Sequence, residues 1–327
     1  MNMNTNINRL LLSAALLVGA GFAGVAVAQS FPEKTVTLVV PYPPGGATDV
    51  IGRMVAEKLP AQWKQQVVVT NRAGAGTTVA AESVARAQGD GYTLYITTAA
   101  HTISASLYGK LKYDPVKDFA PITLISTIPL VLVANPSLPV NSLSELITYA
   151  KAQKNGLTMA STGNGTPQHL AGELFKSKTG TPLTHVPYKG DTPMLTDLLG
   201  GQVQVAFVTL SAALPYINSG KLKPIALAHA QRVAAIPNVP TMTEAGVPDF
   251  TAATWFGIYG PGTMNDALRQ KISVDIQKIV AEPAMTQRLK DMGGEVNNSS
   301  PEAFQKVIAS EVKNWSEAVR LSGARID

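Results

Sequence analysis

Short β-rich runs alternate along this chain with helical segments that are apolar on one face, and this alternation constrains the fold more than any other feature. The first unit consists of the run Thr35–Val40, which ends at Pro41, a loop that contains Gly45 and Gly46, and apolar residues at helical spacing over 50–59. Repeated units of this kind predict an α/β fold, in which parallel sheets carry helices on both faces. Further strands are expected at 67–70, 92–97, 157–160, 183–186, 203–208 and 222–228, and further helices at 77–87, 142–152, 166–178, 192–199 and 211–218.

The C-terminal part departs from this pattern, because one strand-like run at 254–259 precedes helices near 265–281, 284–292 and 301–321. Helices without matching strands suggest a segment that returns to cover the first domain. A length of 327 residues favours two domains. A crossing at Pro121–Pro139 and a return near Leu227–Ala230 would link two lobes by two strands, as in hinged binding proteins. We expect lobe 1 to comprise 29–128 and 229–327, with the C-terminal helices also near lobe 2, and lobe 2 to comprise 129–228.

Residues 1–28 have the pattern of a signal peptide. A polar stretch ends at Arg9, an apolar run covers Leu10–Val18, and Ala26–Ala28 offers the small residues of a cleavage site. The alternative is an uncleaved membrane anchor, but glycines in the segment and the cleavage pattern favour removal after Ala28. We therefore expect a freely diffusing protein of the periplasm.

Composition excludes several classes. The chain is 45% hydrophobic and 15% charged, which is typical of a globular protein. It contains no cysteine, so disulfide scaffolds, thiolate metal sites and a lipid-modified N-terminal cysteine are excluded. The net charge of +5 is mild, and no cluster of Lys and Arg with interleaved aromatic residues is present. Nucleic acid is therefore not an expected partner.

Two glycine-rich loops, Pro41–Asp49 and Ser161–Pro167, lead from a predicted strand into a predicted helix. In open α/β sheets, ligands lie at this position. Glycine removes Cβ atoms, so backbone amides can approach an anion, and Thr48 can cap the first helix. The alternative is that both loops are ordinary turns. One exposed helix N-terminus contributes only about 0.3–1 kcal/mol, whereas micromolar binding needs roughly 8 kcal/mol, so two loops from opposite lobes would have to close over one carboxylate-bearing ligand.

Catalytic motifs are missing from the sequence. The glycine patterns at 163–168 and 74–79 both lack the third glycine of a dinucleotide-binding loop, and no motif of a hydrolase, metalloprotease or P-loop occurs. His169 and Glu173 are four residues apart on one helix, so they could share a proton or a metal; the alternative is a partly exposed pair beside an apolar face. We expect a binding protein rather than an enzyme, with no cofactor and no metal.

The motifs in and around these loops carry a family resemblance. The chain contains Val40–Asp49, Asn71–Gly76, Asp90–Leu94, Gly163–Phe175, His185–Gly190 and Ile236–Thr241 in this order, and together these segments resemble the Bug family, the periplasmic solute-binding component of tripartite tricarboxylate transporters. The resemblance covers nearly all of the chain after residue 28. It implies a periplasmic binding protein fold of the second type, which closes on its ligand, and ligands such as di- and tricarboxylates, amino acids or aromatic acids.

The resemblance also implies the residues that contact the ligand. Asp49 has a second interpretation as a carboxylate placed for the helix dipole, and Lys189 as a solvated loop cation. The implied ligand-binding residues are Tyr42, Gly45, Gly46, Thr48 and Asp49 from one lobe, and Ser161, Thr162, Gly163, Asn164, Thr166, His169, Tyr188, Lys189, Gly190 and Thr209 from the other.

Two positions depart from the family pattern. Where relatives often have an acidic residue after Phe207, this chain has Val208 and Thr209, which argues against a ligand whose ammonium must be paired. Ala105 and Ser106 stand where many relatives have Asn-Pro, so we expect the floor of the pocket to be atypical. The resemblance leaves the identity of the ligand open.

The sequence thus predicts a monomeric periplasmic receptor for a small organic acid, which delivers its ligand to the membrane permease of a tripartite tricarboxylate-type transporter. A second hypothesis is a ligand sensor that acts on a membrane histidine kinase. A third is a periplasmic hydrolase with an unrecognised site.

Overall fold

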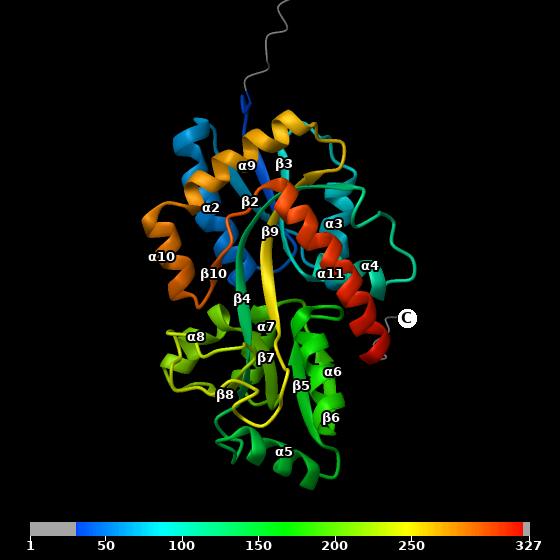
Figure 1. Cartoon of the computed structure of the whole chain (residues 1–327), viewed down its shortest axis with the longest axis vertical. Coiled ribbons are helices and arrows are strands. Elements are labelled where there is room, and N and C mark those ends of the chain that lie inside the picture. Colours follow the sequence, from blue (N-terminus) through cyan, green and yellow to red (C-terminus); the bar gives the residue numbers. More distant parts are fainter. Residues whose placement is uncertain (1–30, 323–327) are drawn as a thin grey trace, which may run out of the picture.

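The β-branched run after residue 35 forms β1 (Val36–Val40), which pairs in parallel with β2 (Val67–Asn71) and β3 (Thr93–Thr98). β9 (Ala253–Pro261) lies antiparallel to β3 and completes this part of the sheet. The structure is a computed structural model that describes residues 31–322. These strands form the sheet of lobe 1, the upper half of the molecule in Figure 1.

Helices cover both faces of this sheet, because its strands alternate their apolar side chains between the two faces. One apolar cluster joins β1 to α2 (Ala47–Trp63), α9 (Asp266–Val280) and α10 (Pro283–Asp291). The other face packs against three helices in a second apolar cluster, namely α3 (Thr78–Ala85), α4 (Ala100–Leu107) and α11 (Pro301–Ser322). The 3₁₀ turn η1 (Ala75–Thr77) leads into α3.

Lobe 2 repeats the same arrangement. β5 (Leu157–Ser161) lies between β6 (Leu183–Pro187) and β7 (Val205–Thr209), with all three strands parallel. The remaining elements of this lobe are α5 (Leu143–Ala152), α6 (Pro167–Thr179), α7 (Asp191–Leu199), α8 (Leu210–Asn218) and β8 (Lys223–Leu227).

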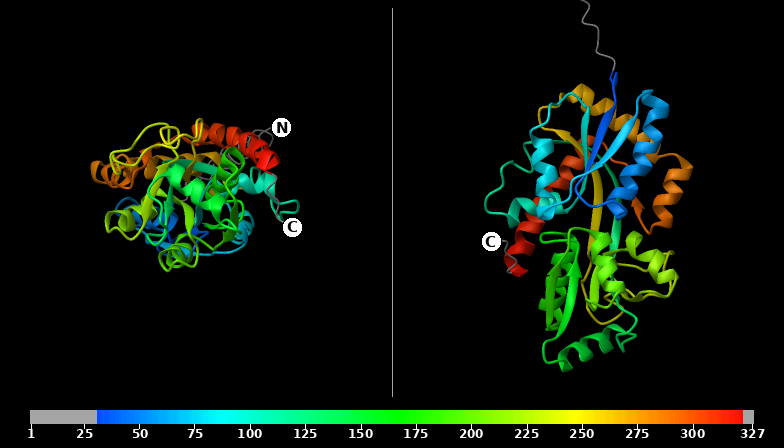
Figure 2. Two further views of the ribbon diagram at one scale, coloured as in Figure 1. Left: turned by 90° about the horizontal axis from the view of Figure 1, so that it is seen from below. Right: turned by 180° about the vertical axis from the view of Figure 1, so that it is seen from behind.

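One long strand, β4 (Phe119–Ala134), runs through both lobes. Its residues 119–129 pair with β9, and its residues 130–134 pair with β7, so the sheet is continuous from one lobe to the other. Figure 2 shows β4 and β9 side by side between the lobes. The expected two-lobed α/β fold with two crossing strands is confirmed, although β4, β8, β9 and the short β10 (Glu295–Val296) make the sheet mixed rather than parallel throughout.

The chain returns to lobe 1 later than expected. After β8 it stays with lobe 2, where Met242, Val247 and Phe250 lie in the apolar cluster of that lobe. The Ala252 amide still donates to the Ala228 carbonyl, and β9 starts at the next residue. The return therefore lies at 252–253, not near Leu227–Ala230, because apolar residues of the intervening loop are buried against lobe 2.

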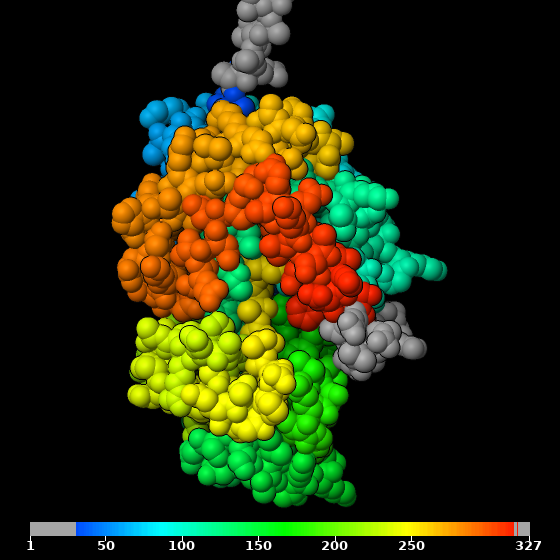
Figure 3. Space-filling model, in the orientation of Figure 1, coloured from blue at the N-terminus to red at the C-terminus, as the bar shows by residue number. Residues whose placement is uncertain are grey.

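The C-terminal helix α11 touches both lobes. Phe304 and Ile308 of α11 share an apolar cluster with Leu170 of α6, and Figure 3 shows this helix (red) reaching from the upper lobe to the lower one. The predicted signal peptide at 1–28 lies outside the described residues. Within 31–322, no helix has both the length and the apolar character needed to cross a bilayer.

Candidate ligand-binding cleft

The two glycine-rich loops come from opposite lobes and face each other at the junction of the lobes. A small cavity lies between them, which we call the central cavity; at about 10 Å³ it has room for one water. Hydroxyl and amide side chains dominate its wall, and neither Lys, Arg nor His is among its lining residues. The cavity is lined by Tyr42, Ala47, Thr48 and Thr98 of lobe 1, by Thr162, Gln168, Asp191 and Thr209 of lobe 2, and by Thr254 and Phe256 of β9.

The lobe 1 side of the cleft is the first turn of α2. Gly45 has a φ of 90°, a conformation that suits glycine, and its amide donates to Asp49 Oδ2 at 3.0 Å. Asp49 also accepts hydrogen bonds from Arg53 and Asn71. Burial opposes ionisation of Asp49, but these hydrogen bonds lower its pKa below the ordinary value. Asp49 therefore holds the loop in place and lines none of the cavities between the lobes.

The lobe 2 side is the first turn of α6. Thr166 is the N-cap residue, since its Oγ1 accepts a hydrogen bond from the His169 amide and donates one to the Gly163 carbonyl at 2.8 Å. Gly163 has a φ of 137°, and a Cβ there would lie 3.0 Å from the Tyr188 carbonyl oxygen. The loop thus needs glycine at this position.

Two histidines support this loop from behind. The rings of His169 and His185 stack with their centroids 4.1 Å apart, and Ser161 Oγ lies 2.6 Å from His185 Nε2. Burial lowers the pKa of both imidazoles, that of His185 to about 3, so both are neutral at pH 7. His169 Nδ1 accepts the Gly165 amide, and neither ring lines the cavities between the lobes.

Contacts between the lobes close the cleft at its centre. Asp191 Oδ2 accepts a hydrogen bond from the Ala47 amide at 3.1 Å, and Thr192 Oγ1 donates to the Pro44 carbonyl at 2.9 Å. Gly190, with a φ of 140°, lets the backbones approach, since a Cβ there would lie 2.8 Å from Pro43 Cδ. Burial raises the pKa of Asp191 to about 6, although the hydrogen bond from Ala47 opposes this rise.

The side chains around the central cavity are only partly paired. Tyr42 Oη lies 3.1 Å from Thr98 Oγ1, and Gln168 Nε2 donates to Thr209 Oγ1 at 3.0 Å. Burial raises the pKa of Tyr42, so its hydroxyl stays protonated. Asp191 Oδ1 and Thr254 Oγ1 are enclosed and have no hydrogen-bond partner within residues 31–322.

A larger space of about 420 Å³, the second cavity, adjoins the central cavity and shares Tyr42 and Thr162 with it. The Lys189 ammonium and the Asn164 amide groups line the second cavity without a hydrogen-bond partner in the described part of the chain. The other lining residues are Gly163, Pro187 and Tyr188 of lobe 2, and Pro41, 74–77 and Tyr108 of lobe 1.

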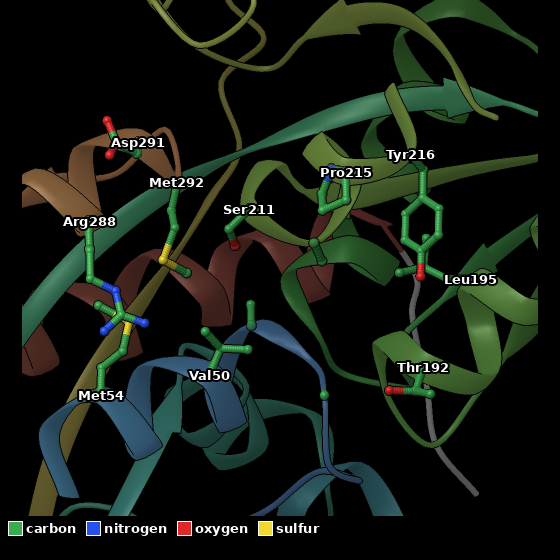
Figure 4. A pocket seen from close by; sticks show the side chains of 13 residues that line it. Val50, Met54, Thr192, Leu195, Ser211, Pro215, Tyr216, Arg288, Asp291 and Met292 are labelled. Carbon is green, nitrogen blue, oxygen red and sulfur yellow. The ribbon is translucent and has the colours of Figure 1, made fainter. Parts of the chain in front are cut away.

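A third cavity of about 610 Å³ lies on the other side of Gly45 and Ala47. Figure 4 shows the apolar side chains of Val50 and Met54 of α2 opposite Leu195 of α7, with Arg288 on the same side as Met54. This cavity is mainly apolar, and the predicted loops contribute only Gly45 and Ala47 to it.

The structure separates the predicted site residues into two groups. One group lies at the cavities or at the contact between the lobes: Tyr42, Gly45, Gly46, Thr48, Thr162, Gly163, Asn164, Tyr188, Lys189, Gly190 and Thr209. The other group, Asp49, Ser161, Thr166 and His169, holds the loops from behind.

Sequence reasoning missed Thr98, Gln168, Asp191 and Thr254 as lining residues. Thr98 ends β3, the neighbour of β1, so the rule that ligands lie at the carboxyl ends of strands could have found it. No comparable signal was available for Thr254 on β9. Among residues 31–322, no cluster of three or more His, Asp or Glu side chains could hold a metal ion.

Known proteins share this architecture over nearly their whole length. BugD aligns with a TM-score of 0.87 at 34% identity, covering 90% of this chain and 99% of BugD. Rpa4515 of R. palustris, solved with adipate, aligns with a TM-score of 0.88 at 34% identity, covering 90% and 100%. MatC from Rhodopseudomonas palustris, solved with bound malate, aligns with a TM-score of 0.84 at 31% identity, covering 88% and 100%.

Sequence comparison agrees with this likeness. Protein BugT of Bordetella pertussis is 34% identical over 324 residues, which cover 98% of this chain and 99% of BugT. The sequence profile of the tripartite tricarboxylate transporter family receptors matches residues 51–323. The chain therefore belongs to this family of receptors, which includes the Bug periplasmic binding proteins.

Proposed function

We propose that this protein is a periplasmic receptor that closes its lobes on a small organic acid and delivers it to a tripartite tricarboxylate-type membrane permease. The observation that carries the proposal is the meeting of two helix-entry loops, one from each lobe, around the central and second cavities. The expected location in the periplasm follows the family, with the segment 1–28 as a cleavable signal peptide.

The chemistry of the cleft supports a carboxylated ligand. The first turns of α2 and α6 present backbone amides, and Lys189 adds a cation at the second cavity. Hydroxyl groups of Tyr42, Thr98 and Thr162 can bind further oxygen atoms directly or through water. The relatives Rpa4515 and MatC were solved with adipate and malate, which are both dicarboxylates.

Isothermal titration calorimetry with a panel of mono-, di- and tricarboxylates, amino acids and aromatic acids tests the binding function. We expect at least one acid to bind with micromolar affinity or better, because two loops and several charge-assisted hydrogen bonds act together. Binding of a neutral sugar or a cation, with no binding of any acid, would overturn the proposal.

Delivery to a permease needs its own test. Uptake of the radiolabelled acid should fall in cells that lack this protein and recover when the protein is restored, provided that the permease genes are present. Unchanged uptake in the deleted strain would remove the transport role while leaving the binding function intact.

A further inference from the structure

Asp191 is the single carboxylate among the residues that line the central cavity. Its Oδ2 accepts the Ala47 amide, whereas its Oδ1 is inaccessible to solvent and lacks a partner within the described residues. An enclosed carboxylate oxygen without a donor is unfavourable. The free oxygen therefore marks a position where a hydrogen-bond donor of a ligand fits.

Thr254 provides an independent indication at the same place. This residue of β9 is 1% exposed, lines the central cavity, and leaves Oγ1 without a hydrogen-bond partner in the described part of the chain. Two enclosed oxygens from different elements, Asp191 Oδ1 on α7 and Thr254 Oγ1 on β9, thus surround one small space. A group with several donors, such as an ammonium, can satisfy both oxygens.

The negative charge of Asp191 favours an ammonium over a carboxylate as the ligand group at this position. No Lys, Arg or His lines the central cavity, so a ligand carboxylate placed beside Asp191 would meet a charge of the same sign in a weakly screened space. An ammonium would instead form a charge-assisted hydrogen bond. The adjoining second cavity has the opposite character, because Lys189 lines it and has no anionic partner among residues 31–322.

We propose that Asp191 determines the specificity of the cleft by binding an ammonium group of the ligand, so that amino acids are preferred to the corresponding acids without an amino group. The carboxylate of such a ligand would lie toward Asn164 and Lys189 in the second cavity, and its ammonium would lie at Asp191. This inference rests on the proposed function, because it assumes that the cleft binds an organic acid.

Val208 and Thr209 led to the expectation that the ligand carries no ammonium that must be paired, and Asp191 changes this expectation. The absence of a carboxylate after Phe207 argued against a paired ammonium, but α7 supplies a carboxylate to the same cavity from Asp191. The central cavity has room for only one water in this closed form, so a ligand enters when the lobes separate and the Ala47–Asp191 hydrogen bond breaks.

Calorimetry with matched pairs of ligands tests the proposal. The pairs are aspartate against succinate and glutamate against glutarate, which differ only in the amino group; malate adds a hydroxyl to the same skeleton as succinate. We expect the wild type to bind one amino acid at least about 10-fold more tightly than its unsubstituted partner, given the strength of charge-assisted hydrogen bonds.

The variant Asp191→Asn keeps the size of the side chain and an acceptor for the Ala47 amide but removes the charge. It should weaken binding of the amino acid by at least about 30-fold, the effect of losing one partner of a buried charge pair, and should leave the unsubstituted acid unchanged or more tightly bound. Asp266→Asn is the matched control, because Asp266 also lies in the first turn of a helix, α9, but is exposed and outside the cleft. It should preserve the wild-type preference.

The outcomes separate this inference from the proposed function. If the wild type binds succinate, glutarate or malate as tightly as the amino acids, or if Asp191→Asn keeps the preference, the role of Asp191 is overturned and the binding of organic acids stands. If no acid in the wider panel binds, the proposed function fails and the inference fails with it. A merely structural role of Asp191 would weaken all ligands alike and would not change the ratio within a pair.

Discussion

Asp191 Oδ2 accepts a hydrogen bond from the Ala47 backbone amide at 3.1 Å, although the two residues are 144 positions apart in the sequence. Ala47 is the first residue of α2 in lobe 1, and Asp191 is the first residue of α7 in lobe 2. The carboxylate thus occupies a helix N-terminus that the sequence marks as a site for a ligand anion. Asp191 Oδ2 and a ligand anion at the first turn of α2 would therefore compete for the same backbone amide.

Closure of the cleft without ligand should depend on pH through Asp191. Burial in the closed form raises the pKa of this carboxyl to about 6, whereas an exposed aspartate has a pKa near 3.9. The closed form therefore binds the proton more tightly, and lowering the pH from 8 to 5 should favour it. The two pKa values set an upper limit of about 100-fold on the change in the ratio of closed to open protein.

Small-angle X-ray scattering of ligand-free protein at pH 8 and pH 5 measures this effect, with a smaller radius of gyration expected at pH 5. Asp191→Asn should show no such dependence, and Asp266→Asn should retain it. Equal radii for the wild type at both pH values would contradict the link between closure and protonation of Asp191.

Gly46→Val should open the cleft without disturbing the fold. The backbone of Gly46 has a φ of −78° and a ψ of 170°, which valine adopts freely. Its new Cβ would lie 2.8 Å from Asp191 Oδ2, so the lobes could not close as they do in the wild type. We expect affinity for the ligand to fall at least about 10-fold, equivalent to 1.4 kcal/mol, while the midpoint of thermal unfolding changes by no more than about 3 °C.

Gly109→Val is the control for this substitution, because no atom lies within 4 Å of a Cβ at Gly109. It should bind ligand like the wild type. Gly163 is a poorer choice for the same experiment, since its φ of 137° would strain any side chain and confound loss of binding with loss of structure. Normal affinity in Gly46→Val would show that the first turn of α2 does not approach the ligand.

Local periodicity predicted most elements because each strand and helix unit is complete within a short stretch of chain. The helices expected at 142–152 and 166–178, for example, lie within one residue of α5 and α6 at each end. The structure differs from the expected elements where contacts join residues that are distant in the sequence. In β4, Pro121 lies beside a register shift and Pro129 lies at the end of the pairing with β9. The loop before β9 stays with lobe 2 because Phe250 packs in the apolar cluster of that lobe.

For the site, local sequence patterns likewise predicted the loops but not the side-chain positions that depend on distant contacts. Glycines after β1 and β5 indicated the two loops, because ligands in open α/β sheets lie at the carboxyl ends of the strands. The side chains of Asp49 and His169 are oriented by contacts with Asn71 on β2 and His185 on β6. These strands are not the ones that lead into the two loops. The position of Asp191 depends on closure of the lobes, so no pattern near residue 191 indicated it. Whether the predicted residues contact a ligand stays a prediction.

Acid should destabilise the fold through His101, which is fully buried in lobe 1. Burial lowers the pKa of this imidazole to about 4, and Nε2 lies 2.8 Å from the Pro115 carbonyl oxygen. The unfolded chain takes up the proton near pH 6.5, whereas the folded protein does so only near pH 4. The contribution of His101 to the free energy of unfolding is therefore fully present above pH 6.5. It is lost as the pH decreases toward 4, by roughly 3 kcal/mol from this group alone.

Urea unfolding at pH 7, 5.5 and 4.5 measures this loss. His101→Gln keeps a hydrogen-bond donor for Pro115 but cannot titrate, so its free energy of unfolding should depend less steeply on pH than that of the wild type. A residual slope remains expected because burial also lowers the pKa of His185 to about 3. Identical slopes for wild type and variant would show that His101 is not protonated on unfolding.

Lys189→Met should weaken ligand binding only modestly, because the side chain is exposed at the second cavity. Exposed ion pairs contribute about 0.2–1 kcal/mol, so we expect the dissociation constant to rise about 2- to 5-fold. Stability should stay within about 0.5 kcal/mol of the wild type, since Lys189 has no hydrogen bond or ion pair in the described part of the chain.

Titrations of the ligand at 20 mM and 500 mM salt should show a weaker salt dependence of the dissociation constant in Lys189→Met than in the wild type. Lys154→Met, an exposed lysine of the same lobe outside the cleft, is the control; equal losses in both variants would assign the effect to net charge rather than to contact with the ligand.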